Sequence, residues 1–255
     1  MKHGLLFRLF PPPTYLAMPA IGVDISDRSI KFAKLELRGQ GFRLPKFGEL
    51  PLPIGVVEGG EIKNPELLTT HLRQLRETSG HQYVTASLPE EKAYLIKLAL
   101  PNISRRDFHS TIELQLEEYV PLEASEIIFD YDLLSIGESE EQKYEVAVSV
   151  FPRTVAEQYQ QSLVAAGFVV TALEIEAQAI ARAVLPVSPK FPRAGRTAIE
   201  TTLVVDFGKT RTSFFIVQSG VVVFSSTTAA IGEESLTTAI QKTLGVDYTE
   251  AERLK

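Results

Sequence analysis

Two stretches far apart in the chain repeat one pattern: an apolar strand, an aspartate, a small residue, a polar turn and a second apolar strand. They read AIGVDISDRSIKFAKLEL at residues 20–37 and LVVDFGKTRTSFFIV at residues 203–217. Each predicts a β-hairpin whose turn can direct several backbone N–H groups at one anion. A carboxylate at the end of a strand can also hold hydrated Mg²⁺. Two such hairpins predict a cleft that holds nucleotide phosphates and Mg²⁺ from both sides, and two unrelated hairpins are the alternative.

The composition is that of an ordinary globular chain. Its 255 residues are 44% hydrophobic and 23% charged, enough to bury the core of one large domain or two. A formal net charge of -6 argues against non-specific binding of nucleic acid. The chain has no cysteine, which excludes disulfides, thiol catalysis and Cys-zinc sites, and its four histidines show no metal-ligand spacing. No apolar run approaches the ~18–20 residues of a transmembrane helix.

The spacing of apolar residues, prolines and glycines predicts an α/β organisation in several parts. We expect a first lobe interrupted by a small α+β block, then a proline-rich linker and a second, shorter lobe. The expected divisions are a flexible tail at 1–15, the first lobe at 16–91 and 152–187, the inserted block at 92–151, the linker at 188–197 and a partial second lobe at 198–255. A short amphipathic element is the alternative reading of the tail.

Helix ends are predicted from capping residues. Asn64 followed by Pro65 predicts the start of a helix, and Gly80 predicts its end. Thr154 and Glu157 have the spacing of a capping box and predict the start of another helix.

The chain resembles the type IV pilus assembly protein PilM family, which has an actin-like, FtsA-like ATPase fold related to ribonuclease H. The resemblance runs from about Leu16 to Lys255 and includes both hairpins, IGEESLTTAI and AERLK. Its most diagnostic piece is LEEYVPLEASEIIFDYDLL, which separates this family from actin, Hsp70 and sugar kinases. The residues that make that distinction are Glu118, Tyr119, Pro121, Glu126, Asp130 and Tyr131.

The resemblance implies two lobes around a nucleotide cleft, an inserted α+β subdomain and a second lobe that is incomplete here. By position, Asp24 and Asp206 would hold Mg²⁺ through water. Glu176 and Gln178 would lie near the attacking water, with Glu176 as the catalytic candidate. The residues expected to contact ATP are Ser26, Asp27, Arg28, Ser29 and Lys31 in the first loop, Gln178, then Gly208, Lys209, Thr210, Arg211 and Thr212 in the second loop, and Gly232.

The resemblance also implies a role in type IV pilus biogenesis. Such a protein would be a cytoplasmic scaffold at the inner face of the inner membrane, in contact with the membrane only through its partner. It would bind the N-terminal cytoplasmic peptide of PilN and link it to other platform and motor proteins of the pilus, without nucleic acid. The alternatives are the actin-like domain of a type II secretion protein (GspL), the division protein FtsA, or a stand-alone actin-like ATPase or kinase.

Three departures from the family pattern bear on nucleotide binding. Glu233 follows Gly232 where the family usually has two glycines, and Lys209 and Arg211 are bulkier than the usual loop residues. The later glycine-rich adenosine motif is missing, so we expect a fragment or a chain completed by another chain. Loss of contacts to roughly ten ligand atoms would cost ~3 kcal/mol, on the order of a hundredfold in affinity. We therefore expect weak ATP binding and at most a weak ATPase.

Overall fold

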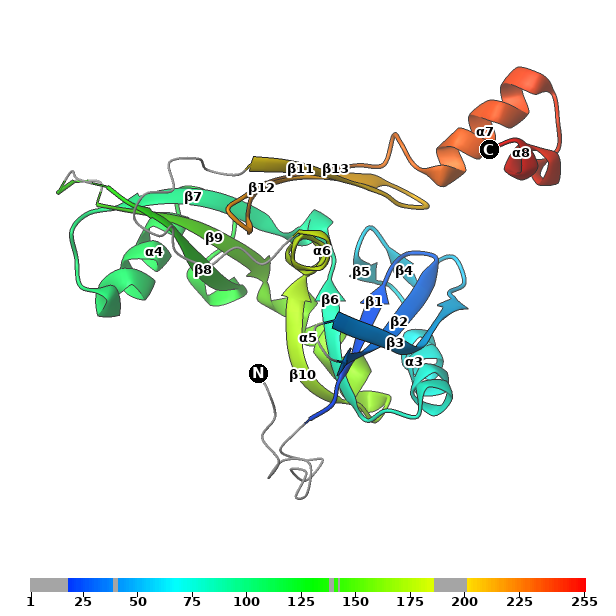
Figure 1. The fold of residues 1–255 in the computed structure, drawn as a ribbon, viewed down its shortest axis with the longest axis horizontal. Coiled ribbons are helices and arrows are strands. Elements are labelled where there is room, and N and C mark those ends of the chain that lie inside the picture. Colours follow the sequence, from blue (N-terminus) through cyan, green and yellow to red (C-terminus); the bar gives the residue numbers. More distant parts are fainter. Residues whose placement is uncertain (1–17, 39–40, 138–139, 142, 186–200) are drawn as a thin grey trace.

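The computed structural model describes most of the chain, and its fold is drawn in Figure 1. The described residues are 18–38, 41–137, 140–141, 143–185 and 201–255. The predicted tail at 1–15 and the predicted linker at 188–197 lie outside the described residues.

The first lobe is a five-stranded mixed sheet in the order β10-β6-β1-β2-β3. Strands β10, β6 and β1 run parallel, and β2 and β3 continue as antiparallel strands. Helices α3 and α5 pack side by side against the sheet, and α6 follows β10 and lies between this sheet and the second lobe (Figure 1). The elements are β1 (Ile21–Ile25), β2 (Ser29–Arg38), β3 (Gly41–Pro51), β4 (Val57–Glu58), β5 (Glu61–Ile62), α3 (Pro65–Ser79), β6 (Tyr83–Leu88), α5 (Arg153–Ala165), β10 (Val169–Ile175) and α6 (Glu176–Val184).

Local signals explain where α3 begins and ends. The Asn64 side chain accepts a hydrogen bond from the N–H of Leu67, and Pro65 occupies the first helical position, as predicted. Gly80 closes the helix with a left-handed backbone (φ 71°) that few other residues adopt. The stripe of Leu68, Leu72 and Leu75 between these ends is fully buried in the lobe core.

The predicted capping box at the start of α5 is wrong. The helix begins at Arg153, directly after Pro152, which is also the last residue of β9. No side chain caps this end, and Thr154 is already inside the first turn. The φ of Pro152 is -62°, so the chain passes from strand to helix without a separate capping residue.

The inserted block forms its own three-stranded antiparallel sheet, β7-β9-β8. Helix α4 packs on it through Phe108, Ile112 and Leu116. The elements are η1 (Glu90–Lys92), β7 (Tyr94–Leu100), η2 (Arg105–Asp107), α4 (Phe108–Leu116), η3 (Ala124–Glu126), β8 (Ile127–Ile136) and β9 (Tyr144–Pro152).

The second lobe contains a three-stranded antiparallel sheet and two helices. One face of the sheet packs on α6, where Phe215 and Val217 meet Ala177 and Ala181. Figure 1 shows α7 and α8 beyond the end of this sheet, on the side away from the inserted block. The elements are β11 (Thr201–Phe207), β12 (Thr212–Gln218), β13 (Val221–Thr228), α7 (Glu233–Leu244) and α8 (Tyr248–Leu254).

Within the described part of the chain, no helix combines the length and the apolar character needed to cross a membrane.

Candidate functional site

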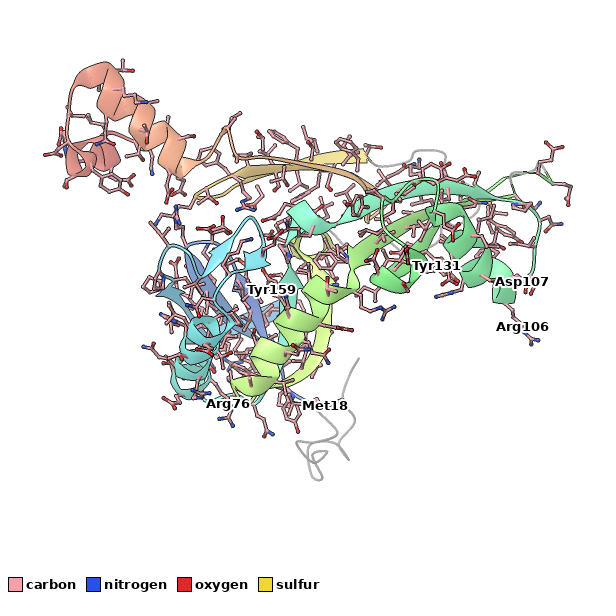
Figure 2. The ribbon with its side chains drawn as sticks, turned by 180° about the vertical axis from the view of Figure 1, so that it is seen from behind. Met18, Arg76, Arg106, Asp107, Tyr131 and Tyr159 are labelled. Atoms are coloured by element: carbon pink, nitrogen blue, oxygen red, sulfur yellow. The ribbon has the colours of Figure 1, made fainter. Side chains whose placement is uncertain are left out.

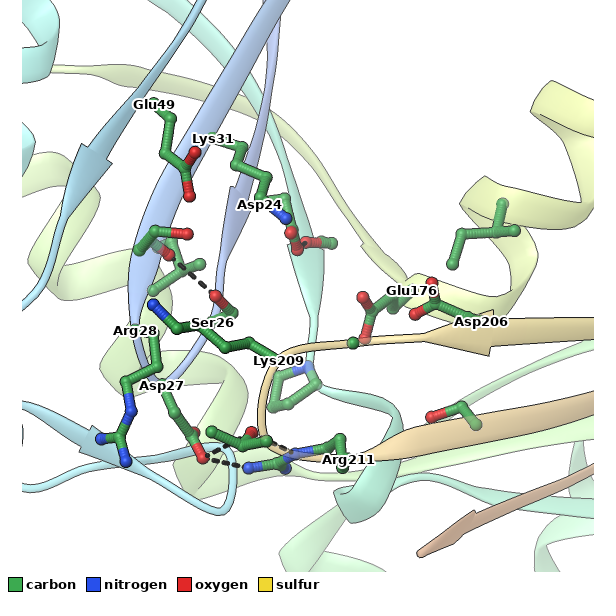
Figure 3. A pocket seen from close by; sticks show the side chains of 18 of the residues that line it. Asp24, Ser26, Asp27, Arg28, Lys31, Glu49, Glu176, Asp206, Lys209 and Arg211 are labelled. Atoms are coloured by element: carbon green, nitrogen blue, oxygen red, sulfur yellow. Dashed lines mark hydrogen bonds and ion pairs between the residues drawn. The ribbon is translucent and has the colours of Figure 1, made fainter. Parts of the chain in front are cut away.

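A cleft of about 900 Å³ lies between the two lobes. The carboxyl ends of the parallel strands β1, β6 and β10 meet at one edge of the first sheet, and this edge forms one wall. The second hairpin and α7 form the other wall, as Figure 3 shows in part. Ligands of α/β sheets usually bind at such carboxyl ends.

The two hairpins have the same internal geometry. In the first, the N–H of Ser26 donates to the carbonyl of Ser29 at 2.9 Å. In the second, the N–H of Gly208 donates to the carbonyl of Arg211 at 2.9 Å. When Asp24 is aligned with Asp206, Ser26 falls on Gly208 and Ser29 falls on Arg211. The repeat in sequence is therefore also a repeat of backbone structure.

Asp24 lies at the end of β1 with a partner that the sequence analysis missed. The Ser87 hydroxyl donates to Asp24 Oδ1 at 2.6 Å. The parallel register of β1 and β6 pairs Val23 with Ala86, and this brings Ser87 beside Asp24. Only the pairing of these two strands identifies Ser87, because nothing in its local sequence distinguishes it from other strand serines.

The start of α7 is bonded directly to the turn of the second hairpin. The backbone N–H groups of Glu233 and Glu234 donate to the carbonyls of Gly208 and Lys209 at 3.1 and 2.9 Å. Gly232 permits this approach, since a Cβ there would lie 2.9 Å from the backbone N of Arg211. Both glutamates line the cleft. Glu233, which replaces the second glycine of the usual family pattern, therefore does face the site.

Three carboxylates gather deep in the cleft. Glu176, the first residue of α6, lies near Asp206, with Asp24 opposite (Figure 3). Burial raises the pKa of Glu176 to about 8, and the charges of Asp24 and Asp206 add to the shift. Burial, then Asp24, also raises the pKa of Asp206, while Lys31 lowers the pKa values of both Asp206 and Glu176. In the described ranges, no three His, Cys, Asp or Glu side chains are grouped to ligate a metal directly.

A fourth acidic residue, Glu90, is buried behind the cleft and was not singled out from the sequence. It is only 2% exposed, and one carboxylate oxygen accepts a hydrogen bond from the N–H of Ala177 at 3.2 Å. Its other oxygen, Oε1, is buried without a geometrically satisfactory hydrogen bond. Burial raises the pKa of Glu90, and the Ser225 hydroxyl and the Ala177 N–H act in the opposite direction.

The cations of the two hairpins fall into two kinds. Arg28 is paired with Glu234, and Arg211 is paired with both Asp27 and Glu91. Lys31 and Lys209 line the cleft, and no carboxylate of the described residues is within ion-pair distance of either amine. Figure 3 shows Lys209 extending from its loop toward the first hairpin.

Most of the predicted site residues lie on this one cleft. They are Asp24, Ser26, Asp27, Arg28, Ser29, Lys31, Glu176, Asp206, Gly208, Lys209, Thr210 and Arg211.

The other three predicted residues are not among the lining residues. Gln178 donates to the Ser149 hydroxyl at 2.7 Å, Thr212 is buried with its hydroxyl donating to Ile231, and the N–H of Gly232 donates to Ser235.

The fold and the cleft place the chain in the actin-like class, and comparisons with solved structures agree. A structure described as the PilM-PilN type IV pilus biogenesis complex is similar with a TM-score of 0.72 and 19% identity, over 93% of this chain and 69% of that chain. The cytoplasmic domain of EpsL, from the type II secretion system of Vibrio cholerae, has a TM-score of 0.53 and 13% identity, over 89% of this chain and 76% of that chain. The ethanolamine utilization protein EutJ from Carboxydothermus hydrogenoformans has a TM-score of 0.51 and 14% identity, over 96% of this chain and 62% of that chain. The predicted actin-like fold is confirmed.

The family is shown by a family model. The model described as type IV pilus assembly protein PilM matches residues 22–255. The chain belongs to this family, and the resemblance read from its sequence is confirmed.

Proposed function

We propose that this chain is an actin-like, ATP-responsive scaffold of the type IV pilus assembly platform. The observation that carries the nucleotide part is the meeting of two equivalent hairpin turns across one cleft, each preceded by an aspartate. That arrangement suits a chain of phosphates, which can be contacted from both sides at once.

The residues of the cleft fit a Mg²⁺-nucleotide. Lys31 and Lys209 come from opposite lobes and have no carboxylate partner among the described residues, so their charges are free to meet phosphate oxygens. Asp24 and Asp206 would hold Mg²⁺ through its water molecules, since this ion usually keeps part of its hydration shell. The ion would supply positive charge that neutralises the phosphates and the nearby carboxylates.

Glu176 is the proposed residue for positioning the attacking water. It is the first residue of α6 and shares the cleft with both aspartates. Its raised pKa, about 8, makes its carboxylate, in the ionised form, a stronger base than that of an exposed glutamate. Glu91 and Glu234 occupy the guanidinium groups of Arg211 and Arg28, and Glu233 adds a further negative charge to the cleft lining. Fewer cations are then left for an anionic ligand, in line with the proposal of weak binding and at most weak hydrolysis.

The proposed partner is the N-terminal cytoplasmic peptide of PilN. Support comes from the family match and from the structural similarity to the PilM-PilN complex, which extends over 93% of this chain. We place the protein in the cytoplasm at the inner membrane, held there through PilN and linked to other platform and motor proteins. The inserted block, 92–151, contributes to the peptide groove in this proposal.

A role in type II secretion is the second candidate, favoured by the similarity to the EpsL cytoplasmic domain. The family match and the higher TM-score to the PilM-PilN complex favour the pilus.

The test is a calorimetric titration of the full chain with a peptide of the PilN N-terminus, with and without Mg-ATP. A scrambled peptide of the same composition is the control. We expect micromolar binding of the native peptide only, and an affinity that changes when Mg-ATP is present. By linkage, the peptide would then change the affinity for Mg-ATP by the same factor. Absence of binding by a folded chain would count against the pilus proposal, whereas binding without a nucleotide effect would count against the ATP response alone.

A further inference from the structure

The mouth of the cleft, where the two hairpin turns face each other, is crossed by ion pairs between the lobes. Arg211 of the second hairpin pairs with Asp27 of the first hairpin and with Glu91 of η1. Arg28 of the first hairpin pairs with Glu234 of α7 through two hydrogen bonds, at 2.9 and 3.2 Å. Figure 3 shows the Arg211–Asp27 pair between the turns of the two hairpins.

The two pairs of Arg211 are better shielded than typical surface pairs. The side chains of Arg211, Asp27 and Glu91 are 20%, 12% and 19% exposed, whereas Arg253 in a pair within α8 is 70% exposed. Arg28 is 23% exposed and its partner Glu234 is 38% exposed, so this pair is the more accessible one. Shielded pairs are screened less by salt than exposed ones, so their attraction persists at physiological ionic strength.

The partners on each side are held by their own lobes. In the first lobe, Gly60 packs so closely that a Cβ there would lie 2.9 Å from a Glu91 carboxylate oxygen. Tyr159 of α5 is labelled in Figure 2. Its hydroxyl donates to the Gly60 carbonyl at 3.2 Å and ties that turn to α5. In the second lobe, the backbone bonds from α7 tie Glu234 to the turn that carries Arg211. Pairs between groups that are already positioned lose little entropy when they form.

We propose that these ion pairs form an interlobe clasp (Arg28, Glu234, Arg211, Asp27 and Glu91) that keeps the cleft closed without nucleotide. The lobes also meet at α6, where the second sheet packs on Ala177 and Ala181. Contacts at both the base and the mouth leave the lobes no free rotation about α6 while the clasp is made. The inference does not depend on nucleotide binding, although an entering phosphate would compete with Asp27 and Glu91 for Arg211.

The test measures the distance between the lobes in the full chain without nucleotide. The chain has no cysteine, so Gln74→Cys on α3 and Thr243→Cys on α7, both exposed positions, can carry spin labels for pulsed electron paramagnetic resonance. The clasp variant combines Asp27→Asn, Glu91→Gln and Glu234→Gln. The matched control combines Asp130→Asn, Glu145→Gln and Glu250→Gln. Glu145 pairs with Lys97 inside the inserted block, Glu250 pairs with Arg253 inside α8, and Asp130 bonds to the neighbouring Tyr131 N–H.

We expect one narrow distance distribution in the labelled parent and in the control. In the clasp variant, which loses all three ion pairs, the population at longer distance should rise at least roughly tenfold, the scale set by loss of a single charged hydrogen bond. Identical distributions in the clasp variant and the control, or a broad one in the parent, would overturn the proposal.

A charge swap guards against a variant that is merely misfolded. Arg28→Glu alone should lengthen the distance, and the addition of Glu234→Arg should restore it; failure of the swap to restore it in a folded chain would contradict the clasp. Addition of Mg-ATP to a variant that carries only Glu91→Gln and Glu234→Gln, and so keeps the predicted ATP contact Asp27, separates the two proposals. Renewed narrowing supports the nucleotide site, and its absence counts against that site while the clasp result stands.

Discussion

Arg28 and Glu234 form an ion pair of 2.9 Å that joins the turn of the first hairpin to the first turn of α7. The pair raises the pKa of the Arg28 guanidinium and lowers the pKa of the Glu234 carboxyl, as expected for two charges that stabilise each other. Together with Arg211 it brings the predicted phosphate loops of the two lobes into direct contact across the cleft.

Replacement of either hairpin aspartate should abolish binding of Mg-ATP. For Asp24→Ala and Asp206→Ala we expect no thermal stabilisation by Mg-ATP, whereas a bound ligand at a hundred times its Kd stabilises by about 2.7 kcal/mol. Without ligand, Asp206→Ala should be more stable than the parent, because the substitution removes a partly buried charge that Asp24 repels. Thermal melts with and without Mg-ATP measure both effects, with Asp130→Ala on β8 as the control. Retained stabilisation in either variant would refute the assignment.

Lys31 and Lys209, which pair with no carboxylate of the described residues, should contribute most to phosphate affinity. A charged hydrogen bond contributes about 1.5–3 kcal/mol, so Lys209→Ala should weaken Mg-ATP binding roughly ten- to hundredfold. Lys242→Ala, on the exposed surface of α7, is the matched control and should leave the affinity unchanged. Equal affinities of the two variants in a calorimetric titration would exclude Lys209 as a phosphate ligand.

A methyl group at Gly232 should disrupt the junction of α7 with the second hairpin. Its Cβ would lie 2.9 Å from backbone atoms of Thr210 and Arg211, too close without movement of the main chain. The backbone at Gly232 is extended, so steric overlap alone should reduce stability, by about 1–3 kcal/mol for Gly232→Ala. Urea denaturation checks this against Gly41→Ala, where a Cβ meets no atom within 4 Å. Equal losses in the two variants would contradict the prediction.

Buried Glu90 should make the fold more stable in acid than in alkali. Burial raises its pKa above the ordinary 4.5, so the folded state keeps a proton that the unfolded state releases. This contribution is complete below pH 4.5 and declines as the pH rises through the pKa of the folded state. Glu90→Gln cannot ionise, so the fall of the unfolding free energy as the pH rises above 4.5 should be smaller in this variant than in the parent.

Urea denaturation at a series of pH values measures this slope. Glu157→Gln, exposed on α5, is the control and should keep the slope of the parent. An unchanged slope in Glu90→Gln would contradict the raised pKa of Glu90 in the folded state.

Features that depend on local chemistry were predictable. The Asn64 cap, the left-handed Gly80 and the two strand–aspartate–turn hairpins follow from hydrogen bonds and backbone preferences within a few residues. The capping box at Thr154 failed because a strand residue, Pro152, leads directly into α5, and a four-residue pattern does not contain that strand.

The contacts between side chains that are distant in sequence could be found only from the tertiary structure. The register of the parallel strands brings Ser87 to Asp24, and the packing of the second lobe brings Glu234 to Arg28 and Glu91 to Arg211. The same packing turns Gln178 toward Ser149 and away from the cleft. The sequence by itself determined the twin hairpins and the family, because both are carried by short contiguous patterns. Only the tertiary structure decided which charges are paired and which face the cleft, because those contacts join residues that are far apart in the chain and depend on how the lobes pack.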